Sequence, residues 1–214
     1  MNRIVTKPTR IDLHIHSAAS TATKDKGKKE LADCDKGHVD VLLRGLEAHG
    51  INMCAITDHD RFDKDLYFAL KEREGDGCLS KVLPGVEFSV SIRAGGEEPT
   101  VIHIVAIFDD RRPELIDGIA GVVCDERGKP RYDDPDNGAF TEDGFAKVLR
   151  GIGLNAVLIG HEKSAGQEAK WRAATLTAAL AAFRYSGRSL GGQVREGVFV
   201  GRRSAPRMES GRVA

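Results

Sequence analysis

The chain has 214 residues, of which 41% are hydrophobic and 30% are charged, and its formal net charge is zero. This length can bury the core of one domain, and the balanced charge gives no reason to expect nucleic acid or an anionic membrane as a partner. No apolar run is long enough to cross a bilayer, the first ten residues lack a signal-peptide core, and the four cysteines form no C-x-x-C pair. We therefore expect a cytoplasmic protein with no membrane partner.

The first half of the chain alternates between predicted strands and helices. An apolar run predicts a strand over residues 10–17, and the helical spacing of apolar residues predicts a helix over 37–50. A second apolar run predicts a strand over 51–60. A second helix is expected over 63–74, with Asp63 or Asp65 as the N-cap.

The second half continues the alternation around a polar stretch rich in Gly, Pro and Asp. Strands are predicted over 81–92, 100–108 and 154–162, and the first two are joined by a turn-like R-A-G-G-E-E-P segment. Helices are predicted just after Pro113, over 141–153 and over 166–183. Strands that alternate with helices indicate a mainly parallel α/β architecture, either a barrel or a doubly wound sheet.

Ionisable residues interrupt the first two apolar runs. Side chains two residues apart on a strand project to the same side, so we expect Asp12, His14 and His16 to point together. His59 closes the second run and follows Asp58. Two imidazoles converging from one strand suggest a metal ion, and Asp12 and Asp58 adjoin histidines whose rings they could orient as hydrogen-bond acceptors.

The later strands carry three further candidates. Glu87 follows a Pro-Gly turn, and His161 closes an apolar run. His103 fits less well, because its apolar run continues beyond it. Functional groups gather at the carboxyl ends of strands in α/β folds, and imidazole and carboxylate together suit zinc, manganese or iron. The pattern therefore predicts a metal centre, whereas His49 lies in a predicted helix and is expected to take no part in it.

The order of these motifs resembles that of the PHP superfamily, named for polymerase and histidinol phosphatase. The resemblance covers about residues 10–164 and is carried by D-L-H-I-H-S, I-T-D-H-D, P-G-V-E-F-S-V, V-I-H-I-V-A-I-F and V-L-I-G-H-E. It is greatest to the PHP domain at the N-terminus of proteins that carry an AAA-type ATPase behind it. The resemblance implies a distorted (β/α)7 barrel that holds two or three divalent ions (Zn, Mn or Fe).

The resemblance also implies a role for each candidate residue. His14 and His16 would hold a first metal, Glu87 would bridge two metals, and His59 would belong to a third site. His103 and His161 would complete the second. The implied activity is that of a hydrolase: a metal-bound hydroxide cleaves the phosphoester of a nucleotide, another phosphorylated small molecule or a nucleic acid. Glu87 is the main residue expected to act in catalysis, with Asp12 and Asp58 behind the ligands.

Several expected ligands are absent from the sequence. Where a further His or Asp would follow the H-x-H, the chain offers Ser20 and Thr21, with Asp25 later, and no Asp-x-His occurs near the C-terminus. We therefore expect a barrel that is incomplete at its C-terminus, and at most two ions. A metal-binding regulatory or structural module without turnover, or a truncated remnant of a larger PHP–ATPase protein, are the alternative interpretations.

The C-terminal residues differ in composition from the rest. Residues 184–214 contain seven Arg, two Glu and no Lys or Asp. We divide the chain into a metal-binding domain over 1–183 and a basic tail over 184–214 that is expected to be disordered. The tail either touches nucleic acid or marks a departure from the original reading frame.

Overall fold

The computed structural model describes residues 9–17, 20, 36–93 and 99–161. Its strands are β1 (Ile11–Ile15), β2 (Met53–Ile56), β3 (Lys81–Ile92), β4 (Thr100–Phe108), β5 (Phe140–Thr141) and β6 (Ala156–His161). Its helices are α1 (Lys36–Ala48), α2 (Lys64–Lys71), α3 (Pro113–Ile116), α4 (Ile119–Val123) and α5 (Glu142–Ile152). The helix predicted over 166–183 and the tail over 184–214 lie outside the described residues.

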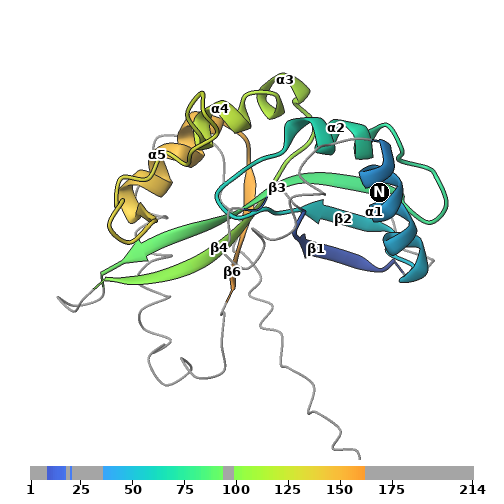
Figure 1. The fold of residues 1–214 in the computed structure, drawn as a ribbon, viewed down its shortest axis with the longest axis horizontal. Coiled ribbons are helices and arrows are strands. Elements are labelled where there is room, and N and C mark those ends of the chain that lie inside the picture. The colour runs from blue at the N-terminus through green and yellow to red at the C-terminus, as the bar shows by residue number, and fades with distance from the viewer. Residues whose placement is uncertain (1–8, 18–19, 21–35, 94–98, 162–214) are drawn as a thin grey trace, which may run out of the picture.

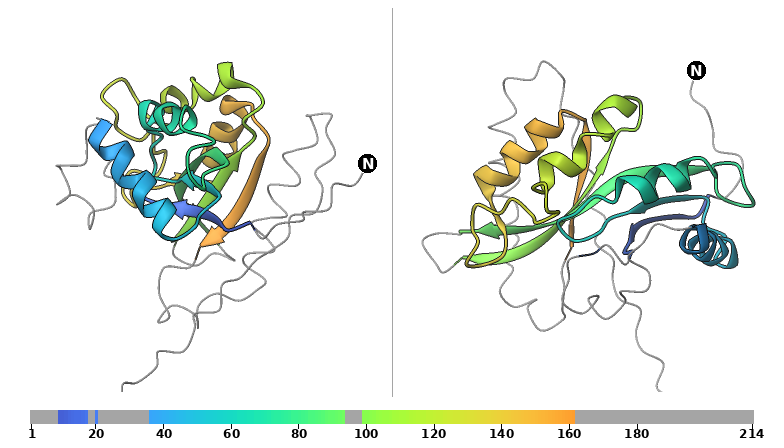
Figure 2. Two further views of the ribbon diagram at one scale, coloured as in Figure 1. Left: turned by 90° about the vertical axis from the view of Figure 1, so that its right-hand side faces the viewer. Right: turned by 45° about the horizontal axis from the view of Figure 1, so that its top comes forward.

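The fold is mixed α/β, built on a single curled sheet. The strands lie in the order β1-β2-β3-β4-β6, and β5 pairs with β3. Figure 1 shows α2 to α5 along one face of the sheet and α1 beside β1 and β2. The long strands β3 and β4 run through the middle, as the right-hand view in Figure 2 shows. The described sheet forms a half-barrel, and the complete seven-unit barrel stays a prediction.

One strand runs against the expected direction. β1, β2 and β3 pair in parallel, but β4 is antiparallel to β3 and β6 is antiparallel to β4. The prediction of parallel strands is therefore wrong for β4, while β6 runs with the first three. Residues 93–99 join β3 to β4, and a parallel pair would need a crossover of roughly a dozen residues or more.

The two faces of the sheet differ in what they bury. On β3, Val86 and Phe88 join the large core beneath the helices, while Gly85, Glu87 and Ser89 alternate onto the opposite, inner face. Within the part of the chain that the structure describes, that inner face carries a small apolar cluster, in which the buried members are Ala55, Val105 and Ile107. The inner face is thus free to carry polar groups.

Local signals placed the starts of α2 and α5 correctly, whereas α2 ends three residues earlier than predicted. Of the two expected caps, Asp63 is the N-cap of α2, and its side chain accepts a hydrogen bond from Leu66 N at 2.9 Å. Thr141 caps α5 in the same way through Gly144 N, and Gly153 ends that helix with a left-handed φ of 70°. Among the described residues, no helix is both long and apolar enough to cross a membrane.

The expected Pro-Gly turn before Glu87 is absent. β3 continues through Pro84 and Gly85, because these residues mark the change from pairing with β2 to pairing with β4. A Cβ at Gly85 would lie 2.7 Å from Thr57 Cγ2, so the side chain of Thr57 packs directly over the glycine. β3 therefore extends beyond the end of β2, and Glu87 lies level with the residues that follow β2.

Candidate metal centre

Glu87 is the central residue of the inner face. Its side chain is 1% exposed, and four histidine rings surround its carboxylate. Oε2 lies 3.1 Å from Nε2 of each of His14, His16 and His59. Oε1 lies 2.7 Å from His103 Nδ1. The two oxygens of one carboxylate thus face different imidazoles.

His14 and His16 reach the carboxylate because β1 contains a bulge. Asp12 pairs with Cys54 and Ile15 pairs with Ile56, so the register shifts between Asp12 and Ile15. The Nε2 atoms of His14 and His16 consequently lie 3.0 Å apart. The histidines do converge, as the H-x-H spacing predicts, but the bulge is what brings them there.

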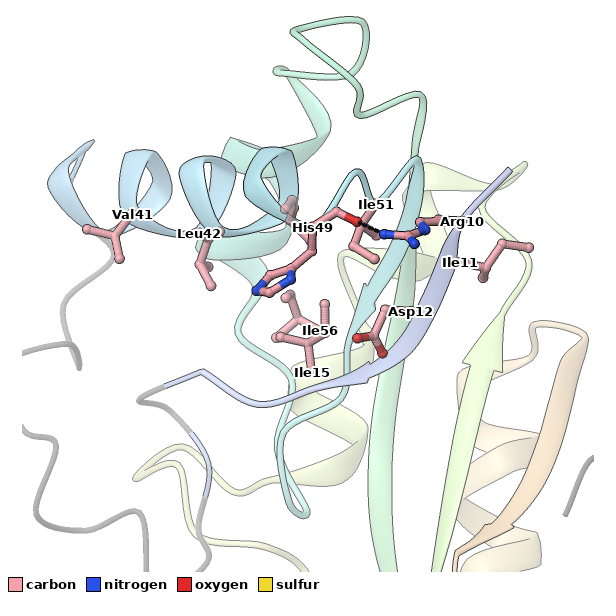
Figure 3. Close-up of a pocket in the computed structure, with 11 residues that line it drawn as sticks. Arg10, Ile11, Asp12, Ile15, Val41, Leu42, His49, Ile51 and Ile56 are labelled. Atoms are coloured by element: carbon pink, nitrogen blue, oxygen red, sulfur yellow. Dashed lines mark hydrogen bonds between the residues drawn. The ribbon is translucent and has the colours of Figure 1, made fainter. Parts of the chain in front are cut away.

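The same bulge turns Asp12 away from the histidines. Figure 3 shows Asp12 with Ile15 and His49 around an open groove between β1 and α1. The Asp12 carboxylate accepts a hydrogen bond from the backbone N–H of His14 at 3.1 Å. The expectation that Asp12 points with His14 and His16 is therefore wrong, because regular alternation does not hold across a bulge.

His59 lies just past the end of β2, opposite Glu87. An isolated parallel bridge joins the two residues, with Asp60 N donating to Glu87 O at 2.8 Å and Glu87 N donating to Asp58 O at 3.1 Å. The structure groups His59 with Glu87 and His103, where the ligand atoms all lie within 4.8 Å of one another. This differs from the separate third site that the resemblance implies for His59.

The reversed direction of β4 explains the position of His103. Because β4 is antiparallel to β3, its beginning lies beside the later part of β3, and His103 pairs with Ser89. An early residue of β4 therefore reaches the same edge as the carboxyl ends of the parallel strands. His161, at the end of β6, pairs with His103 in the sheet register, which puts its backbone at this edge.

Opposing effects act on the ionisation of Glu87. Burial would raise the pKa of its carboxyl group, but hydrogen bonds from His103, His14 and His16 and the charge of His59 outweigh burial and hold the pKa well below its usual range. Glu87 is therefore a carboxylate at neutral pH. A buried negative charge ringed by imidazoles is an arrangement that a cation can stabilise.

The ligand atoms fit divalent ions in spacing and in kind. Two ligand atoms bonded at about 2.1 Å to one ion lie about 3.0 to 3.4 Å apart. The distances among His14 Nε2, His16 Nε2 and Glu87 Oε2 are 3.0–3.1 Å. Together with the group of His59, Glu87 and His103, this makes two sets of residues that could each hold an ion. Imidazole nitrogen with carboxylate oxygen suits zinc, manganese and iron.

Asp58 contacts a serine next to one of the histidines. Its Oδ1 accepts from Ser17 N at 2.5 Å and its Oδ2 from Ser17 Oγ at 2.6 Å. Burial raises the pKa of Asp58, although the hydrogen bonds from Ser17 and the charge of His16 oppose the rise. The predicted hydrogen bond between Asp58 and a histidine ring stays a prediction, and the contacts that the structure shows are with Ser17.

Sequence reasoning did not single out Ser17, Ser89 or Asp60, and it named Ser20 only as a residue that stands where a ligand was expected. Ser20 Oγ lies 3.4 Å from His16 Nδ1 and accepts from His59 N, also at 3.4 Å. Ser17 and Ser89 bond to Asp58 and Asp60 respectively. The signal available was weak: each serine lies within four residues of a candidate ligand. Thr21 and Asp25 lie outside the described residues.

Comparison with known proteins adds little to this geometry. No family model and no curated protein matches the chain. Among solved structures, the chain is similar to a protein of Bifidobacterium adolescentis that is provisionally described as a metal-dependent phosphoesterase. The match covers 82% of this chain and 75% of that chain, with 14% identity and a TM-score of 0.47.

Proposed function

We propose that the chain is a metal-dependent phosphoesterase whose two ions share Glu87. The observation that carries the proposal is the carboxylate with imidazoles at both oxygens: three Nε2 atoms at 3.1 Å from Oε2, and His103 Nδ1 at 2.7 Å from Oε1. Such a carboxylate is suited to bridging two ions. Hydrolysis of a phosphoester as the reaction rests on the PHP-like order of the motifs.

The residues divide into two ligand sets in this proposal. His14 and His16 would hold one ion with Glu87, while His59 and His103 would hold the other, and His161, at the end of β6, would join the second set. When bound, divalent ions neutralise phosphate oxygens and lower the pKa of a coordinated water. Glu87 contributes the negative charge that both sets need.

Exposure indicates the side from which a substrate reaches the site. The side chains of His14 and His16 are 29% and 24% exposed, whereas those of His59 and His103 are 5% and 10% exposed. The β1 side of the site is thus open to solvent, and the β3–β4 side is closed by packing. We infer that the phosphate group approaches over His14 and His16.

The test combines metal analysis with hydrolysis. The purified chain, dialysed against a manganese or zinc buffer, should retain at most two ions and should hydrolyse a generic phosphodiester or a nucleoside phosphate. A metal-dependent rise in melting temperature without hydrolysis would instead support a metal-binding module. A chain that binds no metal and hydrolyses no phosphoester would refute the proposal and favour a truncated remnant. Three tightly held ions would contradict the two-ion arrangement.

A further inference from the structure

The four residues after β2, Thr57 to Asp60, are tied to neighbouring strands by two aspartate–serine pairs of one geometry. In the first pair, Asp58 accepts from both the backbone N–H and the hydroxyl of Ser17, at 2.5 Å and 2.6 Å. Asp58 is 1% exposed and Ser17 is 8% exposed. This pair joins the end of β2 to the end of β1.

The second pair repeats the arrangement two residues later. Asp60 accepts from the backbone N–H and the hydroxyl of Ser89, both at 2.7 Å, and also from Tyr132 OH at 2.9 Å. Asp60 is 2% exposed and has a left-handed φ of 51°, which Asp tolerates better than most residues. This pair joins the end of β2 to β3.

Each serine lies beside a candidate ligand. Ser17 directly follows His16, and Ser89 pairs with His103 across the sheet. Both aspartates flank His59. The first pair therefore connects His59 with the His14–His16 set, and the second connects His59 with the strands that carry Glu87 and His103.

We propose that Asp58 and Asp60 are positioning residues that together set the place of the His59 ring between the two ligand sets. The inference rests on the proposed metal centre. His59 lies beyond the regular ladder of β2, and the two pairs, together with the bridge to Glu87, hold the backbone from which its ring projects. Metal sites need their ligands held to within about 0.5 Å. Removal of groups that orient ligands typically weakens metal affinity about 10- to 100-fold.

The two pairs differ in what they connect, so their loss has different effects. Asp60→Asn loosens His59 from the β3–β4 side and should lower the affinity for the ion held with His103. The affinity for the ion of His14 and His16 should stay the same. Asp58→Asn replaces a charged acceptor by a neutral amide, which loosens the connection between the sets and weakens the binding of both ions. Ser89→Ala and Ser17→Ala, which each keep the backbone hydrogen bond, should give smaller effects of the same kind.

The chain offers a matched control in Asp133. Its carboxylate accepts from the backbone N–H of Thr141 at 2.7 Å and from the Thr141 hydroxyl, in the same two-bond geometry. Asp133 is exposed and lies at the start of α5. Asp133→Asn therefore makes the same change in an equivalent pair that touches neither ligand set.

Two measurements test the inference on the full chain. The apo protein is titrated with Zn²⁺ against a chelator. In Asp60→Asn, the affinity for the ion held with His103 should be about 10- to 100-fold weaker, and in Asp58→Asn the affinity for both ions should be weaker. Asp133→Asn should match the wild type. In ¹⁵N-histidine-labelled apo protein, the His59 ring signals should shift in Asp58→Asn and Asp60→Asn but not in Asp133→Asn.

The two measurements separate the inference from the proposed function. A wild-type chain that binds no Zn²⁺ refutes the metal centre, and the ring signals of the apo protein then still decide whether the aspartates position His59. Unchanged His59 signals in both aspartate variants, or metal affinities equal to those of Asp133→Asn, would overturn the inference.

Discussion

Replacement of Glu87 by glutamine removes one negative charge and little else. The amide has nearly the same shape, and it can accept a hydrogen bond through one atom and donate to a neutral imidazole through the other. The apo variant is therefore expected to fold. Glu87 is the carboxylate that both ligand sets contain. In the variant, each set keeps two imidazoles and loses its anionic ligand.

The expected effect on metal binding is large. Loss of groups that only orient a ligand weakens affinity by about 10- to 100-fold, so loss of the shared ligand should weaken it by at least about 100-fold. At a free-ion concentration of about 100 times the wild-type Kd, one ion stabilises the wild type by about 2.7 kcal/mol. That corresponds to about 5 to 11 °C in Tm for a chain of this size. In the variant, the same concentration about equals Kd and gives about 0.4 kcal/mol, or about 1 to 2 °C.

Thermal unfolding with and without Zn²⁺ or Mn²⁺ measures this difference. Glu72→Gln, on an exposed residue at the end of α2, is the matched control and should keep the full metal-dependent shift. Elemental analysis after dialysis provides an independent count of bound ions. Equal metal content and equal shifts in the wild type and in Glu87→Gln would refute the bridging role.

Three other changes give distinct results. His14→Ala removes an imidazole next to Glu87 and should lower the metal content after dialysis. His49→Ala changes only the groove beside α1 and should leave the metal content unchanged. An equal loss of metal in both variants would contradict the assignment of His14 as a ligand. Gly85→Ala puts a methyl group 2.7 Å from the nearest side-chain atom and should lower the free energy of unfolding in urea by about 1 to 3 kcal/mol. At the exposed Gly45 of α1, the methyl group of Gly45→Ala meets nothing within 4 Å, so this variant should raise the free energy of unfolding by about 0.5 to 1 kcal/mol. A loss of stability in both glycine variants would argue against the close contact at Gly85. Asp110 contacts two lysines; burial opposes its ionisation, but their hydrogen bonds lower its pKa below the usual range. A lowered pKa stabilises the fold above the unfolded pKa of about 3.9 and loses that effect as the pH falls through the folded value. Asp110→Asn should thus be less stable by about 1 to 2 kcal/mol at neutral pH, with the difference shrinking below about pH 4; a difference independent of pH would contradict this.

Local sequence signals were sufficient for β1 to β4, for β6 and for α1, α2 and α5, although not for α4 or β5, and they marked most of the residues that the structure brings together around Glu87. Asp63 and Thr141 mark helix starts because a cap bonds to backbone within its own turn. Apolar runs predicted the strands because each is buried on at least one face. The histidines and Glu87 stood out because ionisable groups are rare on such strands. These signals depend on neighbours along the chain, which one sequence contains.

Tertiary structure decided how those elements meet. The direction of β4, which carries His103 to the site, follows from pairing with β3. The bulge that separates Asp12 from the histidines follows from the register between β1 and β2. The bonds of Asp58 and Asp60 join residues 41 and 29 positions apart in the chain. No local pattern encodes such pairings, because strand register and long-range hydrogen bonds are selected by how whole faces pack.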